Sequence, residues 1–128
     1  MMMIEHVALW AGDLERSREF YTKYFDGTAN AKYTNASGFS SYFIRFSSGA
    51  RLEIMSKPGA ASESGVQERL IGYSHLAFSA GGRDKVDALT EALRAAGYKV
   101  LSGPRFTGDG YYESCVSDPD GNRVEITE

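Results

Sequence analysis

Four side chains that could hold a metal ion stand at matched places in two similar stretches of the chain. The two histidines, His6 and His75, each open an apolar run, HVAL and HLAF. Glu53 and Glu125 lie in the related segments RLEI and RVEI. Two neutral imidazoles and two carboxylates form a mixed nitrogen and oxygen set that suits zinc, nickel, cobalt or iron better than calcium. The residue types therefore predict that all four bind one divalent ion.

The matched places follow from an internal duplication. Residues 49–54 and 121–126 share Gly, Arg, Glu and Ile in register, at a spacing of 72 (125 minus 53). Gly38 and Gly110 keep this spacing, whereas the histidines are 69 apart (75 minus 6), so three residues were gained between the first strand and the third. At 128 residues the chain is long enough for one core but not two independent ones. We expect a single domain, 1–128, made of repeats 1–56 and 73–128.

Each repeat is predicted to run strand, helix, strand, strand, strand, which makes the fold class α+β. In the first repeat we expect strands at 3–10, about 28–34, 39–46 and 51–56, and a helix that Asp13 caps and Gly27 ends. The apolar side of that helix comprises Leu14, Phe20, Tyr21, Tyr24 and Phe25.

The second repeat is predicted to have strands at 74–79, 98–102, 111–117 and 123–127. Its helix carries Val86, Leu89, Leu93 and Ala96 at spacings of three and four, and Gly97 ends it. The segment 118–121, DPDG, predicts a tight turn between the last two strands. Residues 57–72, with Pro58 and three glycines, are predicted to be an exposed linker.

Strand alternation predicts which way the candidate ligands point. Successive strand residues face opposite sides of a sheet. His6 alternates with the apolar Val7, and Glu53 with Leu52 and Ile54; His75 and Glu125 alternate with apolar residues in the same way. We therefore expect the helices to cover the apolar residues, and the four ligands to project onto the other face. Taken singly, each of the four is better interpreted as an ordinary strand residue; their joint placement in both repeats favours the metal.

Composition excludes several other classes of function. Carboxylates outnumber Lys and Arg by 17 to 14, with no basic run, so nucleic acid is not an expected partner. The single cysteine, Cys115, cannot form an internal disulfide, which indicates a reduced intracellular protein. Neither a signal peptide nor a long apolar segment is present, so no membrane partner is expected and a cytoplasmic location is predicted.

Three stretches, 6–21, 72–77 and 118–126, resemble the vicinal oxygen chelate superfamily, and within it glyoxalase I (lactoylglutathione lyase). The resemblance implies two βαβββ modules that form an open, curved mixed sheet or barrel around a metal, usually within a homodimer. Glyoxalase I takes its ligands in the order His, Glu, His, Glu, which His6, Glu53, His75 and Glu125 match. Extradiol dioxygenases and fosfomycin-modifying thiol transferases of the superfamily use two His and one Glu, and bleomycin-binding members bind no metal.

The activity implied is conversion of the hemithioacetal of methylglyoxal and a thiol to an S-2-hydroxyacylthiol through an enediolate, a detoxification reaction. The resemblance implies one divalent ion per site, nickel or zinc, with cobalt as a further choice. It assigns the catalytic base to Glu125, with Glu53 on the other face of the substrate. Cys115 as a nucleophile is a weaker alternative, because both histidines are already committed as ligands.

Two departures from the pattern of glutathione-using members leave the identity of the thiol cosubstrate undetermined. Trp10 stands where glutathione-using members usually have an arginine, and Lys57 stands where an asparagine is frequent. Trp10 shares the strand face of His6, so it is predicted either to stack on substrate or to be a barrel-wall aromatic. Tyr111, beside the loop 107–110, is predicted to contact substrate, with strand packing as its alternative. The rival functions are another metal enzyme of the superfamily (epimerase, dioxygenase or thiol transferase) and a non-enzymatic protein that sequesters a toxic planar ligand.

Overall fold

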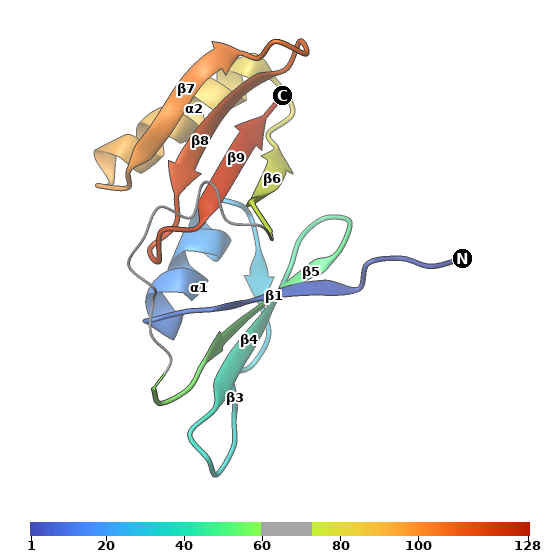
Figure 1. The fold of residues 1–128 in the computed structure, drawn as a ribbon, viewed down its shortest axis with the longest axis vertical. Helices are drawn as coiled ribbons and strands as arrows, with labels where there is room; N and C mark the ends of the chain where they lie inside the picture. Colours follow the sequence, from blue (N-terminus) through green and yellow to red (C-terminus); the bar gives the residue numbers. More distant parts are fainter. Residues whose placement is uncertain (60–72) are drawn as a thin grey trace. The chain divides into compact units, whose positions relative to one another are not determined.

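The computed structural model describes residues 1–59 and 73–128 and divides the chain into two compact units, Met1–Glu63 and Ser64–Glu128 (Figure 1). Apart from residues 57–59, the predicted linker lies outside the described residues. Within the described residues, neither helix is long and apolar enough to span a bilayer.

The first unit is one mixed sheet with one helix. Its elements are β1 (His6–Trp10), α1 (Leu14–Lys23), β2 (Thr28–Ala29), β3 (Tyr33–Thr34), β4 (Ser40–Arg45) and β5 (Arg51–Ser56). The strands are ordered β1-β5-β4-β2, with β3 also paired to β4. β1 and β5 run parallel and the other pairs are antiparallel. The first and last strands of the repeat therefore lie side by side.

The second unit repeats this topology. Its elements are β6 (His75–Ser79), α2 (Arg83–Ala95), β7 (Val100–Phe106), β8 (Tyr112–Ser117) and β9 (Arg123–Thr127). The order is β6-β9-β8-β7, with β6 and β9 parallel. The expected α+β class and the two βαβββ modules with mixed sheets are confirmed.

The helix ends show which capping predictions hold. Asp13 accepts a hydrogen bond from the Arg16 backbone N–H at 3.1 Å, as expected of an N-cap. Gly97 follows α2 with φ of 92°, a left-handed conformation that favours glycine. Gly27 does not end α1, which stops at Lys23. A Cβ at Gly27 would lie 2.4 Å from the Ile44 side chain, so glycine is needed there for close packing against β4.

Two strands differ from their predicted form. The segment predicted as one strand over 28–34 is two short strands, because Asn30 lies between them and bonds the Phe43 backbone through both its N–H (3.0 Å) and its side-chain oxygen (2.9 Å). β7 runs on to Phe106 through two register shifts, one between Val100 and Ser102 and one between Ser102 and Arg105, where Gly103 and Pro104 lie. An edge strand tolerates a proline because the missing donor would face outward, and β7 is the edge of its sheet.

Each helix covers one face of its sheet, and the other face carries the candidate ligands. α1 packs on β4 and β5, and α2 on β7, β8 and β9. The apolar strand residues beneath the helices are fully or almost fully buried; they are Ile44, Leu52 and Ile54 in the first unit and Val116, Val124 and Ile126 in the second. Glu53 and Glu125 lie between buried neighbours and therefore project from the opposite face.

Asp118 fixes the turn that leads into β9. Only 3% of this residue is exposed, and its Oδ1 accepts from the backbone N–H of Asp120 (2.9 Å) and Asn122 (2.8 Å). Its Oδ2 accepts from the Asn122 side-chain amide at 2.9 Å. These bonds organise the 118–121 hairpin and hence the register in which β9 presents Glu125.

Asp118→Ala is expected to lower the free energy of unfolding by about 1 to 3 kcal/mol, because charge-assisted bonds are lost and partly buried donors lose their acceptor. Asp118→Asn should lose less, because its side-chain oxygen can still accept from the two backbone N–H groups. Urea unfolding of the two variants measures the difference. Equal stability of Asp118→Ala and the parent would show that the turn does not depend on this carboxylate.

Candidate metal site

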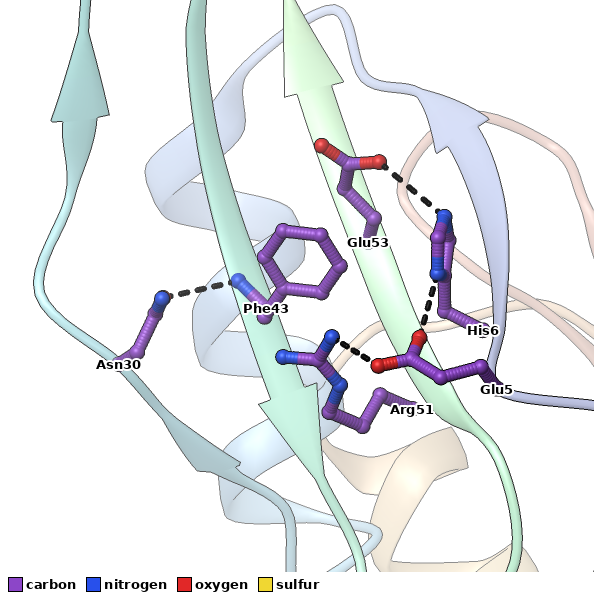
Figure 2. A network of polar contacts seen from close by, with 6 residues as sticks. All are labelled: Glu5, His6, Asn30, Phe43, Arg51 and Glu53. Carbon is purple, nitrogen blue, oxygen red and sulfur yellow. Dashed lines mark hydrogen bonds and ion pairs between the residues drawn. The ribbon is translucent and has the colours of Figure 1, made fainter.

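The first His–Glu pair is built by the parallel strands β1 and β5. Their register opposes His6 to Arg51 and Ala8 to Glu53, so that His6 and Glu53 are diagonal neighbours on one face. His6 Nε2 lies 3.8 Å from Glu53 Oε1 (Figure 2). The Glu53 side chain is only 16% exposed and that of His6 is 42% exposed, so solvent reaches the imidazole more readily than the carboxylate.

The second pair repeats this geometry on β6 and β9. His75 opposes Arg123 and Ala77 opposes Glu125, which makes His75 and Glu125 the same kind of diagonal pair. His75 Nε2 lies 3.2 Å from Glu125 Oε2. The matched spacing seen in the sequence thus places each His beside the Glu of its own repeat.

The distances within each pair fit a shared divalent ion. Two ligand atoms about 2.1 Å from one ion are separated by roughly 3.0 Å at a right angle and roughly 3.4 Å at the tetrahedral angle. The second pair, at 3.2 Å, falls within this interval, and the first, at 3.8 Å, needs a modest side-chain rotation to reach it. Imidazole nitrogen and carboxylate oxygen are also ligands that zinc and nickel accept.

Each pair by itself is half of the predicted ligand set. Among residues 1–59 and 73–128, no group of three or more His, Cys, Asp or Glu side chains is arranged to hold a metal ion. The structure therefore brings His6 to Glu53 and His75 to Glu125, and the joining of the two pairs at one ion stays a prediction.

A third carboxylate, Glu113 of β8, stands beside the second pair. The register of β8 with β9 opposes Cys115 to Glu125 and makes Glu113 a diagonal neighbour of Glu125. Burial raises the pKa of Glu113, and the charge of Glu125 and a hydrogen bond to it raise this pKa further, while Arg105 opposes the shift. A protonated Glu113 would donate its hydrogen to Glu125. The sequence reasoning missed this residue, although strand alternation places Glu113 on the same face of β8 as Cys115, which opposes Glu125.

Around the first pair, Glu5 and Arg51 form a polar network on His6 (Figure 2). Glu5 Oε2 lies 2.5 Å from His6 Nδ1, and Glu5 Oε1 accepts a hydrogen bond from Arg51 Nη2. The bond to His6 and then the bond to Arg51 hold the pKa of Glu5 below its usual value. The Phe43 ring packs edge-on against His6 at 5.3 Å and beneath the Arg51 guanidinium at 4.1 Å. Sequence reasoning also missed Glu5, whose only signal was its place directly before His6.

The remaining candidate residues lie outside the two pairs. Trp10 ends β1, is 46% exposed, and carries the Lys57 ammonium 4.6 Å from its ring centre and the Phe39 ring edge-on at 6.3 Å. Tyr111 is 53% exposed and its backbone N–H donates to the Thr107 hydroxyl at 3.0 Å; its contact with substrate stays a prediction. Burial raises the pKa of the Cys115 thiol, which disfavours the thiolate that nucleophilic catalysis would need.

Comparison with known proteins gives the family. The chain belongs to the Glyoxalase/Bleomycin resistance protein/Dioxygenase superfamily, whose sequence model matches residues 3–126. The superfamily resemblance expected from the three sequence stretches is thereby confirmed.

Individual relatives cover nearly the whole chain. The uncharacterised protein YqjT of Bacillus subtilis is 34% identical over 127 residues, which are 96% of each chain. A lactoylglutathione lyase of Haemophilus influenzae is 31% identical over 134 residues, covering 99% of this chain and 93% of the relative. The solved structure of the trypanothione-dependent glyoxalase I of Leishmania major superposes with a TM-score of 0.77 at 24% identity, covering all of this chain and 87% of the other, and so supports the fold.

Proposed function

We propose that the protein is a metal-dependent lyase of the glyoxalase I type, which isomerises the hemithioacetal of an α-oxoaldehyde and a thiol. The observation that carries the proposal is the repeated His–Glu pair, with Nε2 to Oε distances of 3.8 and 3.2 Å on equivalent strands. The similarity of the chain to a probable and a named lactoylglutathione lyase, at 30% and 31% identity, supports the same reaction. Nickel or zinc, and a homodimeric assembly, are part of the proposal.

The chain's own residues supply the proton transfer. A bound divalent ion would act as a Lewis acid toward the adjacent oxygens of the substrate, where negative charge develops. Glu125 would take the proton from the carbon that bears sulfur and return it to the neighbouring carbonyl carbon. The hydroxyl proton of the first carbon would pass to the oxygen of the second, which gives the 2-hydroxyacyl thioester. Glu53 would serve the opposite face. The Glu125 side chain is 25% exposed, so it is partly shielded from water and still open to substrate.

The thiol part of the substrate is proposed to lie along Trp10. This ring shares the β1 face of His6 and is half-exposed, so a planar or apolar group can stack on it. Lys57 adds a positive charge at the same place, suited to a carboxylate of the thiol. The pair would take the place of the arginine and asparagine expected in glutathione-using relatives.

The proposal is tested by assaying the nickel- and zinc-loaded protein on hemithioacetals of methylglyoxal with glutathione, cysteine and coenzyme A. We expect thioester formation with at least one adduct, and a KM for that adduct raised about 10-fold or more in Trp10→Ala, because one stacked group contributes about 1.5 kcal/mol. Oxygen uptake with a catechol by the iron-loaded protein would support a ring-cleaving dioxygenase instead. Tight binding of a planar ligand without turnover of any adduct would indicate a sequestering protein.

A further inference from the structure

The two His–Glu pairs differ in the group that contacts the Nδ1 atom of each histidine, the ring nitrogen on the side away from the paired glutamate. Behind His6 stands a carboxylate, Glu5, 2.5 Å from Nδ1, whose other oxygen is bonded to Arg51. Behind His75 stands a hydroxyl, Ser74 Oγ, 3.0 Å from Nδ1. Both partners are the residue directly before the histidine, so the duplication has kept the position and changed the chemistry.

The carboxylate imposes one ring state and the hydroxyl does not. An ionised carboxylate can only accept, so a neutral His6 must carry its hydrogen on Nδ1 and donate it to Glu5. Its Nε2 is then left with a lone pair directed toward the Glu53 side (Figure 2). A serine hydroxyl can donate or accept, so Ser74 itself selects neither tautomer of His75, and without a metal the Glu125 carboxylate 3.2 Å from Nε2 favours a hydrogen on that nitrogen.

Glu5 is itself held in place by a second contact. The Arg51 guanidinium, which opposes His6 across the strand pair, donates to Glu5 Oε1 and is stacked over the Phe43 ring at 4.1 Å. The same ring packs edge-on against His6, so imidazole, carboxylate and guanidinium are fixed as one unit. Groups that orient a metal-binding histidine through its other nitrogen raise its basicity and its affinity for the ion.

We infer that Glu5 is a positioning residue that, anchored by Arg51, sets His6 with Nε2 toward the ion, and that the first half of the site is preorganised while the second is adjustable. This inference rests on the proposed function insofar as His6 is a ligand. It adds that the halves contribute unequally to affinity. Arg123 opposes His75 as Arg51 opposes His6, so the second half holds the arginine of the network but lacks the carboxylate.

The first test reads the ring state without any metal. Because the chain has only two histidines, a long-range proton–nitrogen spectrum of the metal-free protein gives two resolved imidazole patterns. In the parent protein, at a pH high enough for both imidazoles to be neutral, we expect one ring held as the Nδ1–H tautomer, which loses that state in Glu5→Ala and keeps it in Ser74→Ala. An unchanged pattern in Glu5→Ala would overturn the inference, whatever the protein catalyses.

The second test measures zinc affinity by competition with a chromophoric chelator. We expect Glu5→Ala to weaken binding about 10- to 100-fold, the range for loss of a group that orients a ligand, Glu5→Gln to lose less, and Ser74→Ala to change it under about 3-fold. Ser74→Glu, which gives His75 the carboxylate that His6 has, should tighten binding. Thermal unfolding of the metal-free variants controls for folding. If the parent binds neither zinc nor nickel, the proposed function fails; if the parent binds the ion and Glu5→Ala binds it equally well, the positioning role alone fails.

Discussion

Glu125→Gln should lower kcat for hemithioacetal isomerisation by about 10³-fold, within the range of about 10² to 10⁴ that a positioned base contributes. Glutamine keeps the size of the side chain and one oxygen for the ion, but it cannot accept the substrate proton. Most of the metal should therefore remain bound. The measurement is steady-state kinetics at saturating metal, together with metal analysis of the same sample.

A matched control separates this effect from a general loss of charge on β9. Glu128 lies three residues on and bonds Arg83 of α2 at 2.9 Å, outside the His75–Glu125 pair. Glu128→Gln should leave kcat within about twofold of the parent, as is usual for a surface substitution. Near-normal turnover in Glu125→Gln would rule out the assigned base, and the other candidate, Glu53, would then take its place.

Removing the metal should abolish the activity and lower the thermal stability. An ion present at about 1,000 times its Kd stabilises the folded state by about 4 kcal/mol, so treatment with a strong chelator should lower the Tm measurably. The metal-free protein should remain folded, because each unit has its own buried apolar residues beneath a helix. Nickel or zinc added back should restore turnover. Full activity in a sample shown by elemental analysis to be metal-free would refute a metal-dependent reaction.

Much of the fold could be predicted because the signals are local and repeated. The alternation of Glu53 with Leu52 and Ile54, and of Glu125 with Val124 and Ile126, is enough to orient β5 and β9. The parallel pairing of first and last strands in each unit then sets His6 beside Glu53 and His75 beside Glu125. Register and side-chain parity are short-range properties, so one sequence suffices for them.

What could not be predicted depends on contacts between elements that alternation does not encode. Glu125 raises the pKa of Glu113 only because β8 and β9 pair in one particular register. Asn30 interrupts a strand because its side chain bonds the backbone of Phe43, thirteen positions later (43 minus 30). Glu5 is exposed and charged, and nothing in the strand pattern distinguishes it from a solvated surface residue until Arg51 is seen beside it.

The most direct test of the central claim, that the two His–Glu pairs serve one ion, is the metal content per chain of the parent, His6→Ala and His75→Ala proteins, measured by elemental analysis after loading and gel filtration. If both pairs bind the same ion, the parent should hold one divalent ion per chain. Both variants should hold almost none, since each removes one ligand of that site. Two ions per chain in the parent, or a variant that keeps its ion when the other pair is broken, would contradict that claim.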